Sequence, residues 1–455
     1  MSLPTGLQRN SRDQVAEMAT QSSSSMRRFW FSVAHTSGAR GYALVANMVI
    51  LVITARWLGP EGRGILGATT TWVALFSTIG CLSLGQVTLY YAVQRRGEAW
   101  LAPVLGSLLF LTGVVTLLGW CVALILHWTT QGSVFNQISP GLLCIGFLML
   151  PFMVWEQYGS SLLMAIDRLK VYNNAQLVAK TTSVAVLIAA LALKLGIASV
   201  LVIALVSQII VSVAGLRELF SRAGGVVRPR RETVRSLLLG GLKLHLNTVG
   251  TFFILSSNIL IINWYCGPTE TGYYQLALQL IGVLVMIPTA MSMVLYGRVA
   301  QLGPDVAWAE QREVLLLLSG GMMGAAVLAA IAGPWLIPLV GGPSFTPAIR
   351  PFQWLLLTTV GMTFSAIMGP QWIGRGLFWQ ASAITMTLGT LNVLASLVSV
   401  PRYGLYGAVW GMVATYALVV LINGLMAAWC EVRCRQHQSG LATFSTSSLG
   451  NARAA

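Results

Sequence analysis

The chain has 455 residues, of which 56% are hydrophobic and only 9% are charged, and its mean hydropathy is +0.74. Soluble domains carry roughly 25% charged residues, so this composition excludes a soluble globular protein and predicts an integral membrane protein. The net charge of +15 reflects membrane topology first, because basic loops face the cytoplasm and attract anionic lipids. The lipid bilayer is therefore an expected partner, and nucleic acid is not.

The apolar segments predict an all-α membrane protein. Residues 1–28 are polar and have no apolar core, so we expect a disordered cytoplasmic tail without a cleavable signal peptide. Twelve runs that follow are long enough to cross about 30 Å of hydrocarbon. Their approximate spans are 37–57, 65–90, 101–127, 138–164, 172–193, 197–219, 239–264, 273–297, 314–340, 348–373, 379–400 and 405–430. The predicted units are a six-helix lobe over 29–219, a basic cytoplasmic linker over 220–238, a second six-helix lobe over 239–430 and a cytoplasmic tail over 431–455.

An internal echo supports this division. The turn at 57–64 recurs at 265–272 with Gly, Pro and Gly each 208 positions further on, and residues 194–196 recur at 402–404 with the same spacing. Gly permits positive φ, and Pro cannot continue a helix, so both mark turns. The shared spacing predicts a duplication into two parallel repeats related by an axis along the membrane normal. The alternative is that Gly-Pro turns between helices are common.

The basic residues indicate the orientation of the helices. One side of the predicted membrane receives the tails, the linker and most cations, whereas the other receives only Arg56, Arg63, Lys194, Arg350 and Arg402. Positive residues concentrate in cytoplasmic loops, so both termini are predicted to be cytoplasmic.

Several kinds of chemistry are not expected. There is no G-x-x-x-x-G-K-[ST] loop for ATP hydrolysis, and the G-x-G-x-x-G match at 62–67 follows a membrane span rather than a β-strand. The six cysteines show no disulfide framework, and Cys430, Cys434 and His437 form only a weak metal pattern. We therefore expect no cofactor, no metal and no catalytic residue.

Ionisable residues within spans are candidates for lining a substrate cavity, unless they reach an interface. For those toward the cytoplasmic side, snorkelling and cavity lining are both open, and Arg56 and Arg63 beside the external turn are expected to be interfacial anchors. The candidates for substrate binding are Arg40, Arg56, Glu156, Lys180, Lys243 and His245.

Lys180 lies too deep in its span to reach either surface, and Glu156 lies at a similar depth on the preceding span. The two residues either form a buried ion pair that fixes helix packing, or Lys180 exchanges Glu156 for an anionic substrate group. Because Glu156 is the only acid well inside a span, the sequence weighs against an exporter that binds cations.

Three segments carry a family resemblance. Trp57-Leu58-Gly59-Pro60 through Gly64, Leu239 through Gly272-Tyr273-Tyr274-Gln275-Leu276-Ala277, and Tyr403-Gly404-Leu405-Tyr406-Gly407-Ala408 resemble the bacterial Wzx-type oligosaccharide flippases of the multidrug/oligosaccharidyl-lipid/polysaccharide exporter (MOP) superfamily. The resemblance covers nearly all of residues 29–430. One departure is Ser257-Asn258, where many relatives carry an Asp-Arg-like pair.

The resemblance implies a MATE-like fold whose two lobes surround a central cavity that opens alternately to each side. It implies sugars on a polyprenyl diphosphate as substrate, the bacterial plasma (inner) membrane as location and the polysaccharide polymerase machinery as a further partner. Cationic cavity residues would attract the diphosphate in a low dielectric. A cation-coupled multidrug exporter of the same fold is the alternative, and a membrane glycosyltransferase or polymerase is a third class. The short external loops disfavour that third class.

The predicted topology is testable by thiol labelling. In a cysteine-free background, a cysteine introduced within 128–137 should react with an impermeant reagent added outside intact cells, and one at position 226 should not. Labelling of position 226 alone would reverse the orientation.

Overall fold

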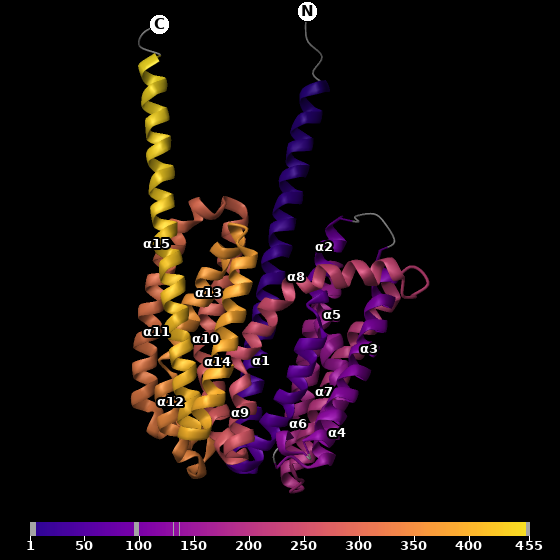
Figure 1. The fold of residues 1–455 in the computed structure, drawn as a ribbon. Coiled ribbons are helices and arrows are strands. Elements are labelled where there is room, and N and C mark those ends of the chain that lie inside the picture. The colour runs from indigo at the N-terminus through magenta and orange to yellow at the C-terminus, as the bar shows by residue number, and fades with distance from the viewer. Residues whose placement is uncertain (1–5, 95–99, 131, 136, 452–455) are drawn as a thin grey trace, which may run out of the picture.

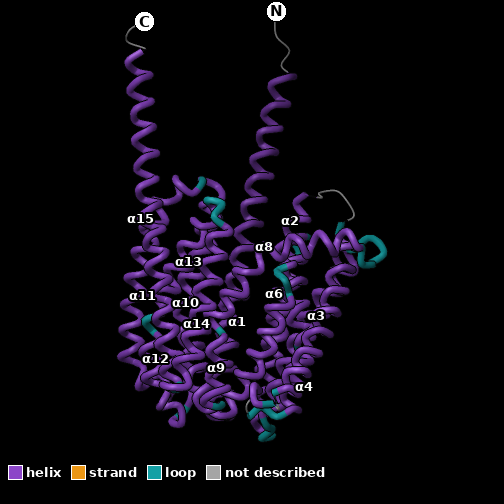
Figure 2. Tube along the Cα trace, in the orientation of Figure 1, coloured by secondary structure: helices purple, strands orange, loops and turns teal. Residues whose placement is uncertain are grey.

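The computed structural model describes residues 6–94, 100–130, 132–135 and 137–451, and their side chains except at 6–40, 90–91, 93–94, 243–244 and 435–451. The regular structure of this part of the chain is helical throughout, which confirms the predicted all-α class (Figures 1 and 2). The helices of the first half are α1 (Gly6–Gly80), α2 (Leu84–Gln94), α3 (Leu101–Thr129), η1 (Ser133–Phe135), α4 (Pro140–Leu148), α5 (Leu150–Ala165), α6 (Leu169–Ala192) and α7 (Ile197–Arg222). Those of the second half are α8 (Arg231–Leu255), α9 (Ser257–Cys266), α10 (Pro268–Leu302), α11 (Pro304–Gly341), η2 (Pro343–Ala348), α12 (Ile349–Leu355), α13 (Thr358–Gly374), α14 (Phe378–Tyr403) and α15 (Leu405–Asn451).

These helices make the chain a multi-pass membrane protein by length and composition. Among the described residues, nine helices are long and apolar enough to cross a membrane, or up to eleven if each of two bent pairs is one span. One of the nine, Gly41–Gly80, has 40 residues, or about 60 Å if straight, roughly twice the hydrocarbon thickness. It contains a non-helical residue, Gly59, at φ 66° and ψ −175°. If each bent pair is one span and Gly41–Gly80 is divided at Gly59, the count is the predicted twelve. That count stays a prediction.

The two Gly-Pro turns share one backbone conformation. Gly267, 208 positions after Gly59, has φ 87° and ψ −179°, close to the values at Gly59. Both positions lie in the left-handed region that disfavours side chains, so each requires glycine. The second repeated segment, residues 194–196 and 402–404, matches less closely. Helices α7 and α15 also begin 208 positions apart, but the positive φ falls on Lys194 in one half and on Gly404 in the other.

The two turns also pack against each other reciprocally. A Cβ atom added to Gly64 would lie 1.7 Å from the carbonyl oxygen of Pro268, and one added to Gly272 would lie 2.0 Å from the carbonyl oxygen of Pro60. Backbone therefore meets backbone at this contact between α1 and α10, with equivalent residues on each side. The exchange supports the predicted duplication, whose lobe boundaries stay a prediction.

A break in the second half is stabilised by uncharged side chains. Between α8 and α9 the helix is interrupted, and the carbonyl oxygen of Phe253 accepts a hydrogen bond of 3.0 Å from Nδ2 of Asn392. Asn258, which is fully buried, donates to the hydroxyl of Tyr274 (3.1 Å) and accepts from the hydroxyl of Ser396 (2.9 Å). Polar backbone within a membrane needs such partners, and here they are neutral.

Helices α1 and α15 extend beyond the same end of the bundle (Figure 1). Residues 6–28 and 431–451 continue these helices, and neither segment contains a proline to end the helix. Between the halves, residues 223–230 are non-helical. The predicted disorder of residues 1–28 and the bounds of the linker and tails stay predictions. Ion pairs between described residues all join segments predicted to be cytoplasmic: Arg168–Glu218, Arg222–Glu218, Arg298–Glu310, Arg312–Glu431 and Arg375–Asp305.

The turn contact predicts opposite effects for two glycines of α10. Gly272→Ala should lower the folded yield and destabilise the protein by about 3 kcal/mol or more, because its Cβ meets backbone that cannot move alone. Gly282→Ala is the control, since no atom lies within 4 Å of its added Cβ. Alanine there should be neutral or stabilise the helix by up to about 1 kcal/mol. The measurement is the melting temperature of the detergent-solubilised protein by size-exclusion chromatography. Equal melting temperatures for the two variants would contradict the described packing.

Candidate functional site

The candidate residues predicted from sequence do not form one cluster. The side chains of Arg40 and Lys243 lie outside the described part of the structure. Arg56 is exposed and donates a hydrogen bond from its guanidinium to the carbonyl oxygen of Leu339, in the last turn of α11. A cation is favourable at a helix C-terminus. This contact gives Arg56 a structural partner, and its predicted role in substrate binding stays a prediction.

His245 lies on α8, where that helix packs against the connection between α1 and α2. Its side chain is buried, and its Nδ1 lies 3.4 Å from the hydroxyl of Ser83. The same hydroxyl lies 2.9 Å from that of Thr248. His245 therefore belongs to a small polar contact between the two halves of the chain.

Glu156 and Lys180 lie on the neighbouring helices α5 and α6, as their depth predicts. Glu156 Oε1 accepts hydrogen bonds from the hydroxyl of Tyr172 (2.7 Å) and from Nε2 of Gln176 (2.6 Å). Tyr172, Gln176 and Lys180 are four residues apart, so they share one face of α6. The ion pairs between described residues do not include Glu156 and Lys180, and the hydrogen bonds that Tyr172 and Gln176 donate to Glu156 both come from neutral groups.

Arg63 differs from its expected role as an interfacial anchor. Its side chain is only 6% exposed. Its guanidinium donates to the hydroxyl of Thr54 (3.1 Å) and to Oε1 of Gln279 (2.6 Å). The position of Arg63 beside the turn predicts contact with lipid headgroups. The packing of α1 on α10 buries Arg63 instead. The ion pairs of the described residues give this buried cation no carboxylate.

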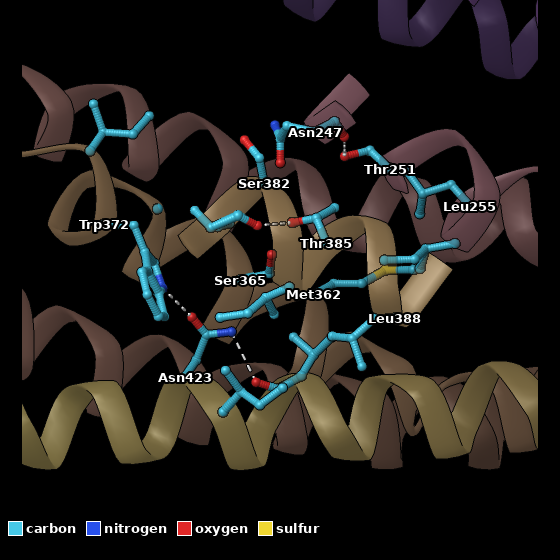
Figure 3. Close-up of a pocket in the computed structure, with 18 of the residues that line it drawn as sticks. Asn247, Thr251, Leu255, Met362, Ser365, Trp372, Ser382, Thr385, Leu388 and Asn423 are labelled. Carbon is cyan, nitrogen blue, oxygen red and sulfur yellow. Dashed lines mark hydrogen bonds between the residues drawn. The ribbon is translucent and has the colours of Figure 1, made fainter. Parts of the chain in front are cut away.

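A pocket of about 510 Å³ lies within the second half and receives Gln86 from α2 of the first half. Figure 3 shows polar side chains from four helices turned toward one another. They are Asn247 and Thr251 on α8, Ser365 and Trp372 on α13, Ser382 and Thr385 on α14, and Asn423 on α15. Pockets of roughly 300–1,000 Å³ suit small ligands. The pocket is therefore a candidate binding site.

Among the residues whose side chains the structure describes, those that line this pocket are uncharged and include none of the predicted candidates, and Lys243, one turn before Asn247 on α8, lies outside that set. The sequence search followed intramembrane charge, so it passed over single Ser, Thr and Asn residues within apolar runs. Such residues are frequent at ordinary helix contacts in membranes. No sequence signal separates pocket residues from packing residues, because the pocket depends on how six helices meet.

Comparison with known proteins places the chain in a family. A family model described as polysaccharide biosynthesis protein matches residues 29–302, which is more than half of the chain. The chain belongs to the polysaccharide biosynthesis protein family. No curated protein sequence matches this family member.

Solved structures show the fold of this polysaccharide biosynthesis protein. An inward-facing multidrug resistance MATE family transporter of the MOP superfamily is 13% identical, with 87% of this chain and 96% of that chain covered and a TM-score of 0.69. The lipid II flippase MurJ in an inward closed conformation is 9% identical, with coverage of 86% and 87% and a TM-score of 0.68. An outward-facing MATE transporter is 15% identical, with coverage of 89% and 96% and a TM-score of 0.56. The predicted MATE-like fold is confirmed.

The hydrogen bonds of Glu156 lead to a sharper prediction for the two intramembrane charges. Lys180→Met should destabilise the protein by less than the roughly 3–5 kcal/mol expected for breaking a buried ion pair, because Tyr172 and Gln176 still bind the carboxylate. Lys194→Met, at an exposed position after the same helix, is the matched control. Melting temperature gives the stability, and transport by reconstituted protein gives the function.

The double variant Lys180→Met/Glu156→Gln separates the two roles. Normal folding with lost transport means that packing alone does not explain the residues. Normal folding with normal transport excludes a substrate role for Lys180.

Proposed function

We propose that this protein is a flippase that moves polyprenyl-diphosphate-linked oligosaccharide across the bacterial plasma membrane by alternating access. Membership of the polysaccharide biosynthesis protein family is the observation that carries this proposal. A flippase and transporters share the fold, which supports a transport role over an enzymatic one. The lipid tail of such a substrate can stay in the bilayer while only the polar headgroup crosses between the lobes.

The present conformation fits one state of that cycle. The halves meet at the Gly64–Pro268 and Gly272–Pro60 contacts, which the charge distribution puts on the outer side. Closure outside corresponds to a state that receives substrate from the cytoplasm. The higher TM-score with the inward-facing MATE transporter than with the outward-facing one, 0.69 against 0.56, supports this state.

The alternative is a cation-coupled multidrug exporter of the same fold. Such a protein needs acidic groups where its cargo or coupling ion binds, because a cation buried without a counter-charge is strongly disfavoured. The lining of the described pocket supplies none. The pocket chemistry therefore favours an uncharged or polar headgroup over a cationic drug.

Reconstitution distinguishes the two functions. We expect purified protein in liposomes to move a fluorescent polyprenyl-diphosphate oligosaccharide between leaflets, as measured by accessibility to a membrane-impermeant quencher. Protein-free liposomes are the control. Efflux of cationic dyes without movement of the lipid-linked sugar would contradict the flippase and support the exporter.

A further inference from the structure

The neutral pocket offers polar groups that the protein itself leaves unused. The side chains of Asn247, Ser365 and Ser382 form no hydrogen bond with another described residue, although all three line the pocket (Figure 3). Two further hydroxyls are partly used, since Thr251 donates to the carbonyl oxygen of Asn247 (2.8 Å) and Thr385 donates to that of Ala381 (2.8 Å). Both keep lone pairs to accept from a ligand. The pocket therefore presents donors and acceptors from three helices.

An aromatic ring is held in a fixed orientation beside these groups. Trp372 donates from its indole nitrogen to Oδ1 of Asn423 (3.0 Å), and Asn423 in turn donates from Nδ2 to the carbonyl oxygen of Val419 (2.9 Å). The amide of Asn423 is thus anchored to its own helix, and the indole is anchored to the amide. A ring held in this way presents a rigid apolar face at little further entropic cost.

The inner end of the pocket reaches the break between α8 and α9. Ile254 and Leu255, the last residues of α8, line it together with Leu388, one turn before Asn392 on α14. Asn392 is the residue that binds the Phe253 carbonyl oxygen next to this break. Transporters place substrate sites at such discontinuous helices near the middle of the membrane. This position is suited to a transported group rather than to a surface ligand.

Charge in and around the pocket selects among ligands. Arg375, two positions after the lining residue Ile373, has a side chain that is only 3% exposed, and it forms an ion pair with Asp305 (2.7 Å). It also donates to Gln371 and lies over the ring of Trp429. Its charge is therefore engaged in these contacts, and the described side chains that line the pocket include neither cation nor anion. An ionised sugar would lose its hydration there without gaining a counter-charge.

We infer that this pocket binds uncharged sugar residues of the transported headgroup, with Trp372 as the stacking surface and Asn247, Ser365 and Ser382 as the hydrogen-bonding groups. The inference rests on the proposed flippase function and narrows its substrate class to headgroups that carry neutral sugars. A hydroxyl-rich ring satisfies unpaired amides and hydroxyls while its C–H face covers the indole. The diphosphate needs cations and binds outside this pocket.

The test compares binding of two synthetic probes to the full-length protein in lipid nanodiscs. Both are undecaprenyl-diphosphate trisaccharides, one of neutral hexoses and the other with two hexoses replaced by uronic acids. We expect the neutral probe to bind the wild-type protein at least about ten-fold more tightly. The diphosphate and lipid are identical, so the difference reports the sugar.

Three variants locate the binding in the pocket. Trp372→Leu should lower the affinity for the neutral probe about ten-fold. Trp372→Phe should retain most of that affinity because it keeps an aromatic face. Trp335→Leu is the matched control, since Trp335 is 71% exposed on α11 and does not line the pocket. Asn247→Lys introduces a cation and should shift the preference toward the acidic probe.

The outcomes separate the inference from the function on which it rests. The sugar site would be overturned if the wild type bound the two probes equally. It would also be overturned if Trp372→Leu and Trp335→Leu lost the same affinity for the neutral probe. Either result would do so even if the protein moves lipid-linked sugars in liposomes. Failure of the wild type both to bind and to move either probe would overturn the flippase as well. If Trp372→Leu fails to fold, the wild-type preference and Asn247→Lys still decide the inference.

Discussion

The close approach of two backbone turns sets the arrangement of the whole molecule. Gly64 and Gly272 bring each half against the other's proline carbonyl, and neither position has room for a side chain. Because each turn is also a left-handed glycine followed by proline, the direction of the next helix is fixed where the contact forms. Helices α1 and α10 therefore form the contact from which the other helices of each half diverge, and Arg63 is buried as a consequence.

A second constraint is that backbone groups near the end of α8 need hydrogen-bond partners outside the helix. The resemblance implies an Asp-Arg-like pair near this point, but here Asn258, Asn392 and Ser396 form the hydrogen bonds. Amides and hydroxyls satisfy the backbone without the desolvation that an ion pair would require. The described side chains that line the pocket beside the break are likewise uncharged.

The sequence predicts the fold well because membrane burial, turn chemistry and loop charge act locally. Apolar length places the spans, and the Gly-Pro echo at 208 positions anticipates two turns with nearly equal φ and ψ. The candidate site is different. A search for intramembrane charge finds Glu156 and Lys180 and the contact between their helices, but it misses the neutral pocket. Asn247 and Trp372 are 125 positions apart, and only the packing of α8 against α13 and α14 makes them neighbours.

The two halves differ in chemistry. Among the residues whose side chains the structure describes, the first half carries Glu156 and Lys180 on α5 and α6, whereas the second half places amides, hydroxyls and Trp372 around its pocket. A polyprenyl-diphosphate sugar is itself divided into an anionic and a neutral part. Cations stabilise the first part, and a fixed ring with unused hydrogen-bonding groups stabilises the second. The reciprocal contact of Gly64 and Gly272 joins α1 of the first half to α10 of the second half, so a movement of either helix at these turns must displace the other.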